Sequence, residues 1–493
     1  MGDITVHMVN SDVTGPAYQY WKVKGSLVLA LSVSYLATNP AYSGEWQFIP
    51  RIEVAESYDD NIRLAEEGKE QSDYVTEVSP GFSFNGKGKR ASLALDYRMQ
   101  NIYYQKNSDS DDTYHNFSMN SNVEFIREKL FLDASATYTQ REVNDDSASS
   151  FDNASITDNR SDVVTYTVRP YYIQTFSQSA VMRIEHTYQE IDNKNDELSN
   201  ADTITNTSVF NLRSGPSFDT FRWQITHREQ VTDYEDNPDI EHRDSKLDTQ
   251  YHLGKTFYLI AIYGYEKFNY DVAPGKHKPE GEYWEAGIGW IPSLRTSLEM
   301  TGGEHYYGNT KRFNFSHRTR LTTWSARYSE TVSTTSRLNA ETDAVRVYNP
   351  DTADFDVYER ENFSNVAAVT LNKIFEASVS KKTGKSDYSA RYSNIKSENL
   401  DIVGNQENSS LSLNWRWKFA SRTRMDLASI QTKTEVQPAQ IETTSKRNEI
   451  KFTLDHSRKA SSFLSYSNDS QQARDDRMLY RRNIYKIGFR MSF

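Results

Sequence analysis

The sequence of 493 residues contains no cysteine and little aliphatic material. Without cysteine, the chain cannot form a disulfide framework, a cysteine nucleophile or a thiolate metal site. Hydrophobic residues amount to only 37%, and the mean hydropathy is -0.77. The formal net charge of -11 is built from mixed signs without a basic patch, which argues against nucleic acid as a partner.

Long apolar runs are also missing, with one short exception near the start. Residues 25–37 are apolar, Lys22 and Lys24 precede them, and a small-residue site follows at 41–43. This is the charged, apolar and cleavable layout of a secretory signal peptide, and the run is too short to cross a bilayer. We therefore expect residues 1–43 to be a signal peptide; an uncleaved inner-membrane anchor is the alternative interpretation.

Aromatic residues, in contrast, are abundant: they make up 13% of the chain, with 32 Tyr and 23 Phe. Low hydropathy and many aromatic residues fit a membrane β-barrel. In such a barrel the lumen and lipid faces alternate along each strand, and aromatic girdles mark both membrane interfaces.

Apolar and polar residues alternate along most of the chain after residue 43, which is the period of a β-strand. One face of a predicted strand carries Leu411, Leu413, Trp415, Trp417 and Phe419, and the other carries Ser412, Asn414, Arg416 and Lys418. The same layout recurs around residues 93–100, 182–189 and 221–228. The charged residues on the polar faces are candidates for lining a lumen: Arg98, Arg183, Glu185, Arg222, Arg228, Arg416 and Lys418.

The connections between these segments are alternately short and long, as in outer-membrane barrels with periplasmic turns and extracellular loops. Short ones are expected at 85–89, 127–129, 177–178, 254–256, 292–294, 318–320, 382–385, 421–422 and 458–461, and longer ones at 107–112, 143–159, 191–206, 232–244 and 436–445. This count predicts that residues 44–493 form an all-β, antiparallel up-and-down transmembrane barrel of about 22 strands, within a range of 18 to 24. The segment Arg337 to Val366 could be a long outer loop, a lumen constriction or an extra hairpin.

The last predicted strand ends the chain with alternating apolar residues up to the terminal Phe493. This ending resembles the signal that the bacterial barrel-assembly machinery reads, so we assign Phe493 as an assembly signal.

A barrel in hydrocarbon must close, because closure alone removes the unpaired edges of the sheet. A ring of about 22 strands encloses a lumen too wide for wall side chains to fill. The function class is then a pore, a plugged pore or a scaffold.

Sequence motifs for chemistry are not evident. The ten histidines form no HxxxH or HxH pair, and no GxSxG, GxxxxGK[ST] or GxGxxG context occurs. We therefore expect no metal, no cofactor and no catalytic site, and place His186 and His227 in an interface belt. A barrel enzyme would escape this test, because its Ser, His and carboxylate can lie on separate strands.

The start of the expected mature chain carries Trp46 to Pro50 and then the motif Glu56-Ser57-Tyr58-Asp59-Asp60-Asn61. A tryptophan near the mature N-terminus, a first strand ending in Tyr-Asp-Asp-Asn and this total length resemble the outer-membrane proteins associated with PEP-CTERM/exosortase systems of Gram-negative bacteria. Those proteins are encoded near exopolysaccharide biosynthesis genes. The resemblance implies a barrel linked to exopolysaccharide export or surface-protein sorting, and it carries over no binding residues.

Three functions remain open at this point. The leading hypothesis is a porin-like channel; the alternatives are a plugged structural or adhesive barrel that binds partners through its long loops, and a barrel enzyme acting on lipid or polysaccharide. The expected partners are outer-membrane lipid and lipopolysaccharide, the barrel-assembly machinery, and exopolysaccharide or its export components.

Overall fold

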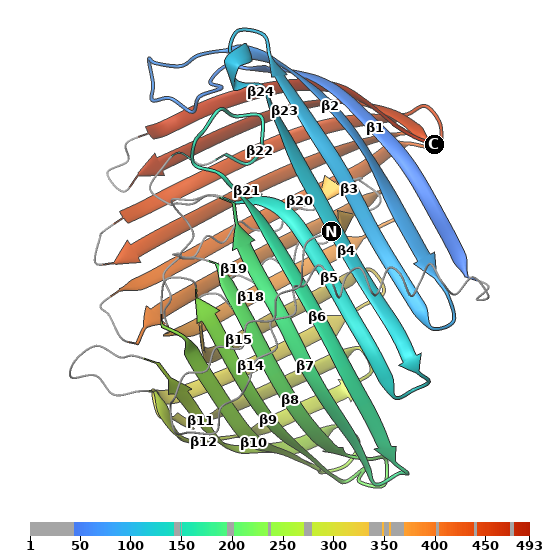
Figure 1. Cartoon of the computed structure of the whole chain (residues 1–493), viewed down its shortest axis with the longest axis vertical. Coiled ribbons are helices and arrows are strands. Elements are labelled where there is room, and N and C mark those ends of the chain that lie inside the picture. The colour runs from blue at the N-terminus through green and yellow to red at the C-terminus, as the bar shows by residue number, and fades with distance from the viewer. Residues whose placement is uncertain are drawn as a thin grey trace, which may run out of the picture.

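The computed structural model describes residues 44–141, 148, 150–194, 202–234, 238–270, 279–334, 348–349, 354–355, 369–400, 404–437, 441–473 and 478–493. Within these residues one antiparallel sheet of 22 strands closes on itself. In Figure 1 the strands coloured blue to green cross in front of those coloured yellow to red, as opposite walls of the barrel. The expected signal peptide, residues 1–43, lies outside the described residues.

The strands of the barrel are, in order, β1 Glu45–Asp59, β2 Asp73–Lys87, β3 Ala91–Tyr104, β4 Asp112–Ile126, β5 Leu130–Arg141, β6 Ser161–Phe176, β7 Ala180–Asn193, β8 Thr203–Ser214, β9 Phe221–Tyr234, β10 Ile240–His252, β11 Phe257–Asn269, β12 Glu280–Ser293, β13 Thr296–His305, β14 Gly308–Arg318, β15 Thr322–Thr334, β18 Val369–Lys382, β19 Ser386–Asn399, β20 Asn405–Ala420, β21 Thr423–Gln437, β22 Ile441–Asp455, β23 Ala460–Ala473 and β24 Met478–Ser492. A 3-10 turn, η1 Ser108–Ser110, precedes β4. No helix in the described ranges is long and apolar enough to cross a membrane.

The barrel closes where its first and last strands meet. Each strand pairs with its neighbour in the chain, and β1 pairs with β24 from Arg51 opposite Ser492 to Asp59 opposite Ile484. The predicted all-β barrel of about 22 strands is confirmed. β15 pairs directly with β18, so the segment Arg337 to Val366 adds no hairpin to the wall; of that segment the structure describes only the short pair β16 Tyr348–Asn349 and β17 Asp354–Phe355.

The turns alternate between a short end and a long end, as expected. At the short end, β4 stops at Ile126 and β5 starts at Leu130, and β20 stops at Ala420 and β21 starts at Thr423. Three long connections were predicted too wide: at 191–206, 232–244 and 436–445 the flanking strands continue into the predicted loop from both sides. Polar strand ends have the composition of loops, but their backbone groups remain paired in the ladder.

One connection at the long end is unexpectedly tight. β13 ends at His305 and β14 begins at Gly308, so Tyr306 and Tyr307 alone join them. Gly308 adopts a φ of +117, a conformation that favours glycine after so sharp a turn. β13 and β14 are also the shortest strands of the described wall, with 10 and 11 residues, so the wall is lowest at this hairpin on the long-loop side.

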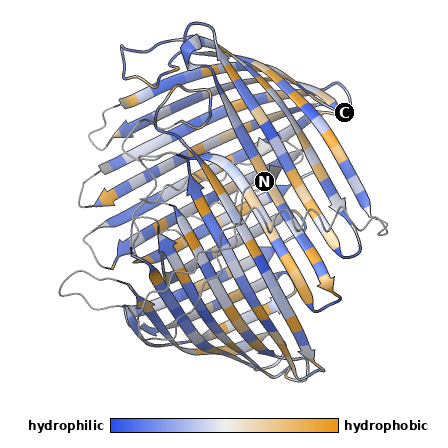
Figure 2. Ribbon diagram, in the orientation of Figure 1, coloured by the Kyte–Doolittle hydropathy of each residue, from blue (hydrophilic) through white to orange (hydrophobic). Residues whose placement is uncertain are grey.

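The outer surface of the barrel is an apolar band. Figure 2 shows hydrophobic and hydrophilic residues alternating along the strands. Outward aromatic residues gather near the short turns: Trp46, Phe48, Phe176, Phe221, Phe257, Trp290, Trp324, Trp417, Phe419 and Phe493 are all at least one third exposed. Ile225, Leu247, Leu411, Leu464 and Ile487 continue the band away from those turns. This is the lipid face of a transmembrane barrel with one aromatic girdle on the short-turn side.

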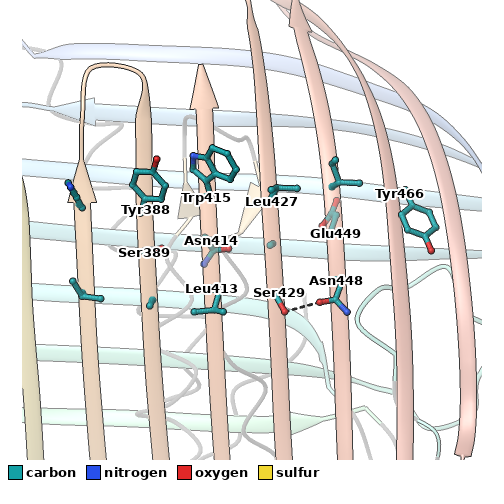
Figure 3. Close-up of a pocket in the computed structure, with 15 residues that line it drawn as sticks. Tyr388, Ser389, Leu413, Asn414, Trp415, Leu427, Ser429, Asn448, Glu449 and Tyr466 are labelled. Atoms are coloured by element: carbon teal, nitrogen blue, oxygen red, sulfur yellow. Dashed lines mark hydrogen bonds between the residues drawn. The ribbon is translucent and has the colours of Figure 1, made fainter. Parts of the chain in front are cut away.

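A hollow of about 560 Å³ interrupts the outer wall between β18 and β23. Tyr388, Trp415, Leu427 and Tyr466 lie in a row along it, and Ser429 donates a 2.8 Å hydrogen bond to Asn448 beside them (Figure 3). Beside these bulky side chains, the smaller Ala390 and Ser429 and the polar Asn448 occupy outward positions and leave the hollow between them.

The inner wall of β11–β13 is packed by its own side chains. A Cβ at Gly264 would come within 2.4 Å of the Tyr283 ring, and one at Gly289 within 1.9 Å of the Tyr258 ring, so these rings lie across the glycines of the neighbouring strand. Both tyrosines form a buried cluster with Ile260 and Ile262. This sector offers little open polar wall.

Candidate channel lumen

Register assigns each side chain to one face of the barrel, because residues directly opposite in an antiparallel ladder point to the same side. The exposed Trp417 on β20 lies on the lipid face, so Arg416 and Lys418 beside it point inward. By the same argument Arg98, Arg183, Glu185, Arg222 and Arg228 all point into the barrel. Their role in lining a solute path stays a prediction.

The inner wall around the closing strands is crossed by ion pairs. We call this region the seam: the inward side chains of β22–β24 and β1–β3. Arg490 lies 2.5 Å from Glu53, and Lys486 lies 2.6 Å from Glu77. Arg51 binds Asp96 in two hydrogen bonds.

At the long-loop end of the seam, Arg482 of β24 is fully buried among carboxylates. Its guanidinium lies 2.6 Å from Asp152, 2.8 Å from Asp469 and 3.3 Å from Asp59. Arg447 adds a second cation at 3.5 Å from Asp152. Buried charges of this kind are tolerated only when they are paired.

Asp152 does not belong to the wall but to the β5–β6 connection, whose residues 150–160 fold into the barrel. The Tyr104 hydroxyl donates to the carbonyl of Ala154 at 2.9 Å, and the Ile156 amide donates to the carbonyl of Ile62 at 2.9 Å. Ile62, Val75, Ile102, Tyr104 and Ala154 pack together as a buried apolar cluster beneath it. Residues 150–160, the inner loop, narrow the outer mouth on the seam side.

The partners of Asp152 keep its carboxyl group ionised. Burial would raise the pKa of its carboxyl, but the positive charges of Arg482 and Arg447 outweigh that effect and place the pKa below its ordinary value. The inner loop is thus bound to the wall by an ionised group.

The Tyr58-Asp59-Asp60-Asn61 motif has a structural role at the seam. The Asp60 carboxylate accepts the backbone N–H of Asn483 and its side-chain amide, both at 2.7 Å. Asn61 donates to the carbonyl of Arg481 at 3.1 Å. The motif therefore fastens the end of β1 to β24.

The wall of β4–β9 differs from the seam. A hollow of about 990 Å³ lies against it and extends to β1–β3. Amide and hydroxyl side chains dominate its inward lining, which includes Asn120, Asn122, Thr167, Gln189, Thr205, Thr207 and Gln230. We call the inner face of β4–β9 the amide sector.

Four of the charged residues in the amide sector form two neighbouring ion pairs. Arg169 lies 2.6 Å from Asp133, and Arg183 lies 2.7 Å from Glu185, with side chains between 20% and 43% exposed. Arg183 also stands over the Tyr171 ring at 4.1 Å. These pairs remain in contact with the lumen.

The low wall of β12–β14 carries a third arrangement. The buried Glu285 accepts hydrogen bonds from Thr301 at 2.6 Å and Arg312 at 2.9 Å, and lies 3.3 Å from His305. Inward Arg312, Asn314 and Ser316 are exposed on β14. No group of three or more His, Cys, Asp or Glu side chains within the described ranges is placed to hold a metal ion.

Sequence reasoning found the inward charges of the middle strands but missed Arg482 and Asp152. Continuing the alternation of the last strand backward from Arg490 and Lys486 would have placed Arg482 on the inner face. No signal in the sequence marks Asp152, because its partners Arg447 and Arg482 come from the distant strands β22 and β24.

A family model described as "Putative beta-barrel porin 2" matches residues 39–246. No curated protein matches the sequence significantly. Among solved structures, the chain is similar to the FrpB iron transporter from Neisseria meningitidis (F5-1 variant, apoprotein form), with 10% identity, a TM-score of 0.50, and coverage of 90% of this chain and 81% of that one. It is also similar to the siderophore receptor PirA from Pseudomonas aeruginosa, with 9% identity, a TM-score of 0.45, and coverage of 91% and 80%.

The FrpB likeness and the porin model agree with the geometry. At such low identity the FrpB structure supports the fold alone, and the porin model covers β1 to the middle of β10. Together with the closed sheet and its apolar outer band, they identify the protein as a β-barrel of the bacterial outer membrane, whose residues 39–246 are similar to the porin model.

Proposed function

We propose that the barrel is a passive channel for polar solutes, and that its solute is a saccharide linked to exopolysaccharide export. The observation that carries this proposal is the amide sector with its hollow of about 990 Å³. Side-chain amides and hydroxyls both donate and accept hydrogen bonds, which is the chemistry that sugar hydroxyls need.

The arrangement of charge favours a weakly bound solute. Arg169 and Arg183 are already paired with carboxylates, so they present little net charge to the lumen. Conduction requires binding that is favourable on entry yet weak enough for exit. A wall of neutral hydrogen-bonding groups meets both conditions for a neutral or weakly anionic saccharide.

Single-channel conductance of the refolded protein in a planar bilayer tests the proposal. We expect a steady conductance that added oligosaccharide blocks reversibly. The double variant Gln189→Leu with Gln230→Leu should weaken the sugar block without closing the channel. Gln431→Leu, on the outer face of β21, is the matched control and should leave the block unchanged.

Two results would count against it. A barrel closed at all voltages would favour the plugged scaffold, and a conductance indifferent to sugars would leave a channel of another selectivity.

A further inference from the structure

The lipid face of β9 and β10 carries a serine, a histidine and a carboxylate side by side. His227 of β9 stands directly opposite Ser245 of β10, and the distance between its Nδ1 and the serine Oγ is 2.7 Å. The other ring nitrogen, Nε2, lies 3.6 Å from Oε1 of Glu229. All three point outward, since they alternate with the inward Arg228 and Asp244.

The position of this group in the membrane is defined by its neighbours along each strand. Toward the short turns lie Ile225 and Leu247, which are each 42% exposed as parts of the apolar band. Toward the long loops the outer face becomes charged, with Arg243 at 3.5 Å from Glu229 and with Lys267 paired to Glu280. The group therefore lies at the outer boundary of the band, where acyl chains meet the polar headgroups.

We propose that Ser245, His227 and Glu229 form a hydrolytic site for carboxylic esters of outer-leaflet lipids. The arrangement has the form of an activated nucleophile: a hydroxyl hydrogen-bonded to an imidazole whose second nitrogen faces a carboxylate. An ester linkage of a membrane lipid lies at the depth where this site opens.

The reaction balances with water as the only co-reactant. Ser245 Oγ attacks the ester carbonyl while Nδ1 of His227 takes the hydroxyl proton. The tetrahedral intermediate expels the lipid alcohol, which leaves with that proton, and the acyl group stays on Ser245. Water then attacks the acyl ester, His227 takes its proton and returns it to Ser245, and a fatty acid is released.

Glu229 is a positioning residue in this scheme. Its carboxylate holds the ring with Nε2–H toward it and stabilises the imidazolium that forms during attack. Backbone amides of the paired strands are committed to the ladder, so the side chain of Arg243 is the group that would face the oxyanion or an anionic headgroup.

A second serine and histidine nearby form a built-in control. His186 Nδ1 of β7 lies 3.0 Å from Ser208 Oγ of β8, also on the outer face. Ser208 stands opposite Glu229, so this carboxylate is on the serine side and not behind the imidazole. The pair has the same depth in the membrane and the same exposure as the proposed site, but it lacks the sequence of serine, imidazole and carboxylate.

The test uses the full barrel reconstituted in vesicles of phosphatidylethanolamine and phosphatidylglycerol, and separately in vesicles that also contain lipopolysaccharide. Free fatty acid is measured by mass spectrometry, and folding of each variant is checked by heat-modifiable gel migration. We expect release in at least one composition, which identifies the lipid source, and covalent labelling by a fluorophosphonate. Ser245→Ala should abolish labelling and lower the rate more than about 1000-fold, and His227→Gln should lower it about 100- to 10000-fold.

Two further variants separate chemistry from structure. Ser208→Ala should keep full release. Glu229→Gln should lower kcat with little change in KM, because the imidazolium that forms during attack loses its stabilising charge. Absence of release from both vesicle types, or release that survives in folded Ser245→Ala, would overturn the proposal and leave the group as an interfacial lipid contact.

Discussion

The seam and the amide sector are two parts of one inner wall, yet they are built from different chemistry. The seam is crossed by buried ion pairs and covered by the inner loop, whereas the amide sector is lined by neutral hydrogen-bonding groups beside a hollow. β4 to β9 are joined to one another through their connections, but β1 and β24 are the two ends of the barrel and no connection joins them. Ion pairs and the Asp60–Asn483 contact hold the two ends together, while the amide sector is left free for solute.

The largest effect on stability is expected from removing the central cation of the seam, and this change tests whether the seam and the amide sector differ in their role. Arg482→Leu leaves the buried Asp59 and Asp469, and the partly buried Asp152, without their shared partner, and breaking a buried pair costs about 3–5 kcal/mol. We expect incomplete closure and a large loss of folded barrel in urea titrations followed by heat-modifiable migration. Arg222→Leu, exposed on the inner face of β9, is the control and should change stability by less than about 0.5 kcal/mol. Equal losses in both variants would refute the special role of the seam.

A smaller change should release the inner loop without opening the wall. Asp152→Asn removes the charge that binds the loop, and hydrogen bonds to charged groups contribute about 2 kcal/mol. The ratio of undocked to docked loop should then rise about 30-fold. Single-channel recordings should show higher mean conductance and more open-channel noise. Asp158→Asn, at an exposed position of the same loop, should behave as the unmodified protein.

Acid should release the same contact through the same group. The pKa of Asp152 is lowered in the folded state, so its stabilisation is complete above the unfolded value of about 3.9 and is lost as pH falls through the lower folded value. Conductance should therefore be constant from neutral pH to about pH 4 and rise only at lower pH. In Asp152→Asn this acid step should be absent; a step near neutral pH in the unmodified protein would point to another group.

Features that depend on interactions between residues close in sequence could be predicted, whereas features that depend on contacts between distant residues could not. The alternation around Trp415 and Trp417 is local, so it predicted the strands, their two faces and the strand number. The limits of the long connections were less predictable, because Asn193 and Thr203 are polar residues that remain in the ladder. Their pairing depends on the neighbouring strand and not on their own type.

The functional groups divide in the same way. Arg98 and Arg228 were placed inside by local alternation, whereas Asp152 meets Arg482 across 330 residues of sequence. His227 and Ser245 are 18 residues apart on paired strands, and their contact depends on a register that the turn between them determines. Neither contact can be inferred from the spacing of these residues in the sequence.

The smallest effect is expected where the amide sector carries charge in contact with the lumen. Glu185→Gln breaks the pair with Arg183, but partly exposed pairs contribute at most about 1 kcal/mol, so stability should hardly change. The freed guanidinium adds one positive charge to the hollow, and the reversal potential in a salt gradient should shift toward anion preference. Glu53→Gln in the seam makes the comparison sharper, because its partner Arg490 is mostly buried and the same loss of charge should lower stability with little change in selectivity. If both variants altered selectivity alike, solute would pass along the seam as well. The seam would then not differ from the amide sector in its role.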